Sequence, residues 1–132
     1  MKIRTDFVTN SSSVSYIITM NLEIVDVFLR HYGDSEQHAS DLRIAQALKN
    51  FMKENGSMVY LHNHEIYTYL MEFRDDDGEC LTKEMLQEEG MNTDPSQMNE
   101  TELFKYIRGE LIHNQKLSSV LPGFGATQVE QY

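Results

Sequence analysis

The longest run of mainly apolar and aromatic residues covers positions 57–73, and a polar pair, Asn63 and His64, divides it. Two such runs on either side of a short polar break predict a β-hairpin with a two-residue turn. In this hairpin His62 lies opposite Glu65, and each further pair steps one residue outward along both strands. Successive side chains of a strand point to opposite sides, so the hairpin has two faces of different character.

One predicted face is aliphatic, and we expect the core to bury it. The other face presents tyrosine, methionine and phenylalanine side chains. These either pack under a further layer of helices or form an amphipathic patch that contacts a protein partner, a second copy of the chain or a small ligand. The aliphatic face consists of Val59, Leu61, Ile66 and Leu70, and the aromatic patch consists of Tyr60, Tyr67, Tyr69, Met71 and Phe73.

The rest of the chain alternates between strand-like and helix-like patterns. Apolar residues at alternate positions predict strands over residues 2–8 and 14–20, which can form a second hairpin. Apolar residues at helical spacing, with capping residues at the ends, predict four helices. The helices begin after Asn21, at Ser40, at Thr82 and after Asn99.

Three stretches leave alternatives open. Branched residues within 22–32 keep a strand as the alternative to the first helix. Residues 79–81 are compatible with a short strand, and residues 126–132 with an edge strand or an untethered tail. Together the elements predict a single α+β domain over residues 1–132, in which a small antiparallel sheet, built from the N-terminal hairpin and the central hairpin, packs with about four helices.

The charge of the chain is concentrated in one segment. The 132 residues carry a net charge of -10, and the segment from Glu72 to Glu102 holds eleven acidic residues against two basic ones. The acidic segment would repel phosphates, and the remainder has no basic stripe with interleaved aromatic residues, so we expect no nucleic-acid binding. The segment is either a solvated face or a docking surface for a basic partner or cations.

Several features indicate a soluble cytoplasmic protein. No run approaches the roughly 18 apolar residues of a membrane helix, so we expect no membrane partner. The N-terminal stretch lacks the continuous apolar core and cleavage site of a secretory signal. A single cysteine, Cys80, excludes an intrachain disulfide, which suits a reducing compartment.

The N-terminal segment resembles one found in other proteins. Residues 2–13, KIRTDFVTNSSS, lead into the apolar stretch that includes residues 15–18, SYII. This arrangement is similar to an N-terminal segment that recurs in a group of uncharacterised bacterial proteins, where a serine run precedes a hydrophobic strand. The resemblance implies a bacterial source and assigns no chemistry. The residues themselves predict a turn whose serine hydroxyls bond nearby backbone groups, with a phosphate-binding nest as the alternative.

His62, His64 and Glu65 form a local cluster of metal-ligating side chain types. The hairpin places His64 in the turn and His62 beside Glu65, so a metal site would need ligands from elsewhere in the fold. The alternative is a polar hairpin tip in which His62 bonds Glu65 across the strands. The other histidines that could complete a site are His31, His38 and His113.

No catalytic, cofactor or nucleotide motif is present to assign a reaction. We find no nucleophile within a known signature and no glycine-rich dinucleotide fingerprint, so we predict no cofactor and no catalytic residues. The favoured function is a small, non-enzymatic interaction or assembly module that uses the aromatic patch or the acidic segment. The alternative is a metal-binding protein or metal-dependent enzyme that uses His62 and His64 with other histidine or acidic ligands.

Overall fold

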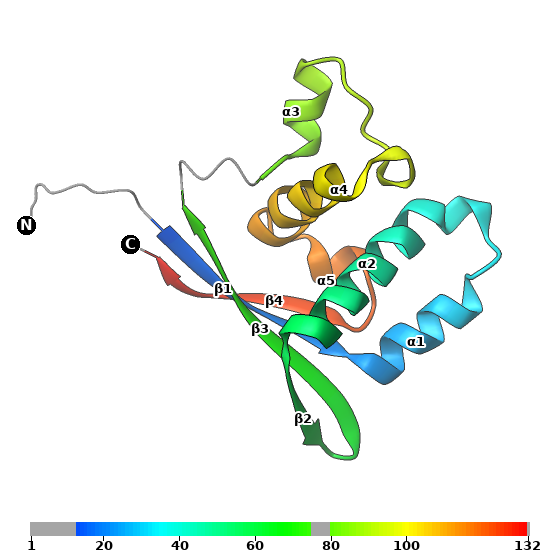
Figure 1. Cartoon of the computed structure of the whole chain (residues 1–132), viewed down its shortest axis with the longest axis vertical. Coiled ribbons are helices and arrows are strands. Elements are labelled where there is room, and N and C mark those ends of the chain that lie inside the picture. The colour runs from blue at the N-terminus through cyan, green and yellow to red at the C-terminus, as the bar shows by residue number, and fades with distance from the viewer. Residues whose placement is uncertain (1–12, 75–79, 132) are drawn as a thin grey trace, which may run out of the picture.

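The computed structural model describes residues 13–74 and 80–131. Within these residues, four strands form one antiparallel sheet in the order β2-β3-β1-β4 (Figure 1). The strands are β1 (Ser13–Asn21), β2 (Ser57–Leu61), β3 (His64–Arg74) and β4 (Phe124–Gln131).

The helices gather on one side of this sheet (Figure 1). This arrangement of a sheet with packed helices confirms the predicted α+β class. The α-helices are α1 (Leu22–His31), α2 (Ala39–Asn55), α3 (Lys83–Glu88), α4 (Glu100–Tyr106) and α5 (Leu117–Val120), and the other helical turns are the 3-10 helices η1 (Glu36–His38) and η2 (Pro95–Gln97) and the π-helix η3 (Ile107–His113).

The strand β1 lies in the middle of the sheet, between β3 and β4. Its alternating pattern has the predicted effect: Tyr16, Ile18 and Met20 are buried under the helices, whereas Ile17 points to the opposite face and is 37% exposed. The neighbours of β1 come from the middle and the end of the chain. The strand expected over residues 2–8, and most of the segment that resembles the bacterial group, lie outside the described residues.

The turn between β2 and β3 lies one residue earlier than the sequence predicted. His62 and Asn63 form it, with φ angles of 49° and 70°, the left-handed pair of a type I′ turn. Leu61 therefore pairs with His64, and the predicted turn at Asn63 and His64 is wrong. Because the partner of each β2 residue moves by two positions, every side chain of the paired strands keeps its predicted face.

The prediction that the core buries the aliphatic face of the hairpin is wrong. The helices cover the face with the aromatic residues, which bury more area per side chain than aliphatic residues do. Ring contacts fix this packing: the Phe73 ring meets Tyr16 at 5.5 Å between centroids, and Tyr69 meets Phe51 at 4.9 Å. The exposed fractions are 9% for Tyr67, 5% for Met71 and 3% for Phe73, against 44% for Val59, 56% for Leu61 and 62% for Leu70.

The helix caps at Asn21 and Asn99 form where the sequence predicts them. The Asn21 side chain accepts a hydrogen bond from the Ile24 amide, so residues 22–31 form a helix and not the alternative strand. Asn99 and Glu102 form the predicted capping box. Thr82 caps α3.

The last third of the chain differs from the prediction in two ways and confirms one of its alternatives. Residues 80–82 form no strand, and residue 79 lies outside the described part. The helix that begins after Asn99 changes into the π-helix η3, and the short α5 follows it. The C-terminal stretch forms the edge strand that was one of its two predicted alternatives, and not an untethered tail: β4 begins at Phe124 and pairs with β1.

Replacing Asn63 by glycine should stabilise the protein. Glycine adopts a positive φ without the steric cost that other residues bear, so the free energy of unfolding should rise by up to about 1 kcal/mol. The measurement is urea or thermal unfolding. The control Asn50→Gly, inside α2, should lose roughly 0.3 kcal/mol from helix propensity, and it also loses the hydrogen bond that Asn50 accepts from Gln46. A loss of stability in Asn63→Gly would contradict the described turn.

Candidate functional site

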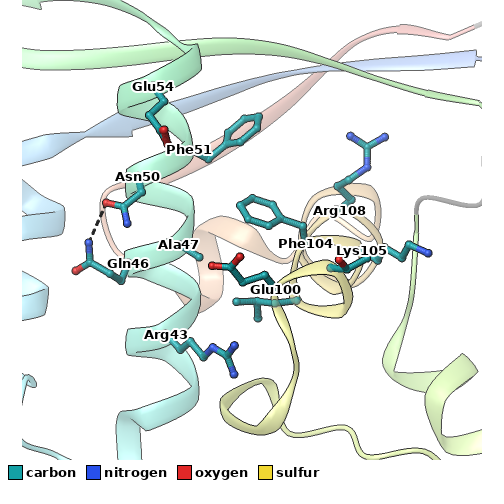
Figure 2. Close-up of a pocket in the computed structure, with 12 residues that line it drawn as sticks. Arg43, Gln46, Ala47, Asn50, Phe51, Glu54, Glu100, Phe104, Lys105 and Arg108 are labelled. Atoms are coloured by element: carbon teal, nitrogen blue, oxygen red, sulfur yellow. Dashed lines mark hydrogen bonds between the residues drawn. The ribbon is translucent and has the colours of Figure 1, made fainter.

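A groove of about 780 Å³ lies between α2 and the helix formed by α4 and η3 (Figure 2). Its size is within the range of small-ligand clefts. The α2 side of the groove consists of Arg43, Gln46, Ala47, Asn50, Phe51 and Glu54, and the facing side consists of Glu100, Thr101, Leu103, Phe104, Lys105 and Arg108.

Two phenylalanines form the aromatic part of this groove. Figure 2 shows Phe51 and Phe104 pointing toward one another from the facing helices, and their ring centroids are 5.6 Å apart. Phe51 also packs against Tyr69 of β3. The two rings therefore join α2, α4 and the sheet, which makes them part of the packing as well as of the groove.

The basic side chains around the groove have structural contacts of their own. Arg43 donates hydrogen bonds to the carbonyl oxygens of Pro95 and Ser96, at 3.1 and 3.0 Å, and so ties α2 to η2. The Arg108 guanidinium lies 4.6 Å from the centre of the Phe73 ring, within cation–π range. Lys105 points away from α2 (Figure 2). This arrangement does not focus positive charge on one point of the groove.

A second pocket, of about 380 Å³, surrounds the carboxylate of Glu110 in the π-helix. The Glu110 side chain is 7% exposed, and its Oε2 atom lies 2.6 Å from the Lys116 ammonium. The backbone amide of Lys83 donates to its Oε1 atom at 2.9 Å. Burial of Tyr106 beside this carboxylate raises the pKa of the tyrosine, and the charges of Glu110 and Asp41 act in the same direction.

Opposing effects set the pKa of Glu110. Burial alone would raise it, but the hydrogen bonds from Lys116 and the Lys83 amide, together with the positive charge of Lys116, outweigh burial and lower the pKa. Glu110 is therefore an ionised anchor that holds the start of α3 and the Lys116 side chain against η3. An ion-paired carboxylate with a lowered pKa is a poor proton acceptor, so the contacts favour a structural role.

The π-helix also brings the chain before α3 close to η3. The Leu81 amide donates to the Lys105 carbonyl oxygen at 2.9 Å. Next to this bond, Gly109 leaves no room for a side chain, because a Cβ atom there would lie 2.3 Å from the Leu81 carbonyl oxygen. The glycine is required by close backbone contact, a reason that its sequence context did not reveal.

Replacing Gly109 by alanine should destabilise the fold. The methyl group would meet the Leu81 backbone, which has to move, at a cost of about 2 kcal/mol. Urea unfolding measures the change. The control Gly90→Asn should lose less than about 1 kcal/mol, because a Cβ at Gly90 meets no atom within 4 Å and asparagine tolerates its positive φ. Equal losses in the two variants would contradict the contact.

The stability of the protein should depend on the charge of Glu110. Since folding lowers its pKa, the ionised group stabilises the fold above the ordinary glutamate pKa of about 4.3, and the effect is lost as the pH falls through the lower pKa of the folded state. Glu110→Gln should cost about 2 kcal/mol at neutral pH. In urea unfolding, the gap between variant and wild type should close on acidification. A gap that is independent of pH would contradict the anchor.

A third region is the face of the sheet that none of the described helices covers, here called the helix-free face. Alternation along the strands places branched and aliphatic side chains on it. Ile66 also belongs to this face and is half-buried. The large exposed side chains of this face are Ile17 at 37%, Val59 at 44%, Leu61 at 56%, Leu70 at 62% and Val129 at 49%.

The strand β2 is exposed on both of its faces. All five of its residues are exposed, including Met58 at 41% and Tyr60 at 66% on the side that faces the helices. The reason is visible in Figure 1, where β2 and the adjoining part of β3 project beyond the helices. The absence of charge from Ser57 to Leu61 is the sequence signal that indicates this surface.

The predicted contact patch is divided by the structure. Tyr67, Met71 and Phe73 are buried under the helices and Tyr69 is half-buried, whereas Tyr60 is exposed. Of the predicted patch, Tyr60 is thus the residue with most of its surface available for contact. The apolar surface that is open lies mainly on the opposite face.

The histidine cluster at the hairpin tip is spread out by the turn. His62 lies in the turn, and His64 and Glu65 are neighbours on β3 whose side chains point to opposite faces. The His64 ring lies 3.6 Å from a carboxylate oxygen of Glu23 and 3.5 Å from the Asn21 amide nitrogen. Among the described residues, no group of three or more histidine, cysteine, aspartate or glutamate side chains is arranged to hold a metal ion.

The other histidines lie at separate places in the fold. His31 and His38 flank the Tyr32 ring, at 4.6 and 4.2 Å between centroids. His113 packs against Tyr16 and Phe73. These rings serve aromatic packing at two distant sites.

Part of the acidic segment has local structural roles. Asp94 caps η2 and accepts hydrogen bonds from the hydroxyls of Ser40, at 2.6 Å, and Ser96, at 2.8 Å. These bonds lower the pKa of Asp94. Glu102 completes the capping box of α4. Residues 75–79 of the segment lie outside the described part.

Comparison of the chain with protein-family models, with curated proteins and with solved structures gave no significant match. Among the described helices, none is both long enough and apolar enough to cross a membrane.

Proposed function

We propose that the protein is a non-enzymatic assembly module that associates with a second copy of itself through β2 and the adjoining part of the helix-free face. The observation that carries this proposal is the exposure of β2 on both faces. A strand whose apolar side chains all face solvent gains burial only when another surface covers it.

The edge of β2 lacks the usual protection against pairing. Sheet edges in monomeric proteins are commonly blocked by charged side chains, proline or bulges. The sequence of β2, SMVYL, has no charged residue and no proline. The opposite edge of the sheet differs, because the pairing of β4 with β1 contains a register shift. Beyond the end of β2, Arg108 donates to the Glu72 carbonyl oxygen of β3 at 3.5 Å.

Charge limits where two copies of the chain can meet. The chain carries a net charge of -10, so two copies repel one another unless they meet at a neutral surface. The strand β2 is such a surface. A basic partner would instead be attracted to the acidic segment, which lies elsewhere in the chain.

Val59→Lys should abolish self-association. Val59 is 44% exposed in the middle of β2, and a lysine there would have to be buried next to its symmetry mate or against the partner's apolar face. The dissociation constant should rise at least about 100-fold. The measurement is light scattering after size exclusion over a concentration series.

The matched control is Val27→Lys on α1. Val27 is 49% exposed and lies away from the sheet face, so its replacement should leave the association unchanged. A wild-type protein that stays monomeric at every concentration would overturn the proposed function, as would equal weakening by the two lysines.

A further inference from the structure

The hairpin geometry determines which backbone groups of β2 are available to a partner. In a hairpin with a two-residue turn, the residues that flank the turn exchange both backbone hydrogen bonds, and bonded pairs then alternate with non-bonded pairs. Leu61 flanks the turn and pairs with His64. The amides and carbonyls of Leu61, Val59 and Ser57 therefore point toward β3.

A side-chain contact agrees with this assignment. The Thr68 hydroxyl of β3 donates to the Ser57 carbonyl oxygen at 3.4 Å, so this carbonyl faces β3. The intervening residues, Met58 and Tyr60, consequently direct their amides and carbonyls outward, away from the sheet. These four groups are the hydrogen-bonding edge that β2 presents.

We propose that two copies pair their β2 strands antiparallel about a twofold axis at Val59, so that the two sheets become one continuous sheet. This inference rests on the proposed function and specifies its geometry. An isologous pairing requires that each residue meet its partner reciprocally. With the axis at Val59, Met58 of each copy lies opposite Tyr60 of the other, and these are the residues with outward groups.

The register satisfies the backbone and the side chains together. Each Met58–Tyr60 pair exchanges two hydrogen bonds, because both members direct an amide and a carbonyl outward. Their side chains share one face, so the methionine sulfur can pack on the tyrosine ring. On the other face the two Val59 side chains meet as a close, non-bonded pair. No charged side chain of β2 enters this contact.

Other registers satisfy fewer of these conditions. An axis at Tyr60 places Met58 opposite the turn residue His62, and an axis at Met58 places Tyr60 opposite Gly56, outside β2. A shift of one residue places an outward-pointing residue opposite one whose groups are already used within the hairpin. A parallel pairing cannot form a closed twofold dimer from this edge. A face-to-face packing of the helix-free faces would bury Leu70, which lies on β3 beyond the reach of β2, and would leave the β2 edge unpaired.

Two substitutions separate edge pairing from face-to-face packing. Met58→Pro removes an outward amide without removing a bond inside the hairpin, and it should weaken association roughly 30-fold, because each dimer loses two backbone hydrogen bonds. The control Met58→Ala keeps the amide and should weaken association less. Leu70→Lys should leave an edge-paired dimer intact. Light scattering over a concentration series gives the dissociation constants.

Cysteine cross-linking tests the register in a Cys80→Ser background. Val59→Cys should form an intermolecular disulfide under mild oxidation, because the Cα atoms of a close antiparallel pair are within disulfide range. Leu61→Cys, on the same face, should not, because its own counterpart would lie about 13 Å away.

The outcomes distinguish the two proposals. A dimer that survives Met58→Pro and is lost in Leu70→Lys overturns the edge register and leaves the proposed function standing with a face-to-face contact. Cross-linking through Leu61→Cys in preference to Val59→Cys also overturns the register. A monomeric wild type overturns both.

Discussion

The burial of one face of β1 is the interaction on which the rest of the structure depends. Tyr16, Ile18 and Met20 lie at the centre of the sheet under the helices, with exposed fractions of 2% or less. The strands β3 and β4 occupy both edges of β1, so the elements from the middle and the end of the chain are joined through it. Because the described helices gather on this face, none of them lies over the opposite face of the same strands, where aliphatic side chains are exposed.

In the helical layer, the π-helix η3 and the chain before α3 are joined by close backbone contact and not by side-chain packing. The change from α4 to the π-helix η3 brings the Leu81 backbone against Gly109. The Glu110 carboxylate then accepts hydrogen bonds from the Lys83 amide and the Lys116 ammonium. A buried carboxylate with these partners suggests chemistry at first sight, since π-helices and shifted pKa values are frequent at functional sites. The hydrogen bond from the Lys83 amide and the ion pair with Lys116 instead hold the start of α3 in place.

Local signals predicted much of this fold, and tertiary contacts account for the rest. The caps at Asn21 and Asn99 were predictable because a side chain bonds an amide three residues ahead. The alternation of residue types along the hairpin assigned its side chains correctly to the two faces, but it could not show which face the helices would cover. The π-helix and the need for a glycine at position 109 depend on Leu81, a contact between distant residues. The open edge of β2 was not predicted for a related reason: whether a strand edge is open depends on which other elements of the fold lie beside it.

The covered sheet face stabilises the fold, and we propose that the open edge of β2 assembles two copies. The proposed edge pairing is tested most directly by hydrogen exchange of individual β2 amides at low and high protein concentration. The amides of Val59 and Leu61 are bonded within the hairpin and serve as internal references. We expect the outward amides of Met58 and Tyr60 to exchange rapidly in dilute protein and to become protected as the concentration rises. Rapid exchange of these two amides at every concentration would contradict the edge pairing.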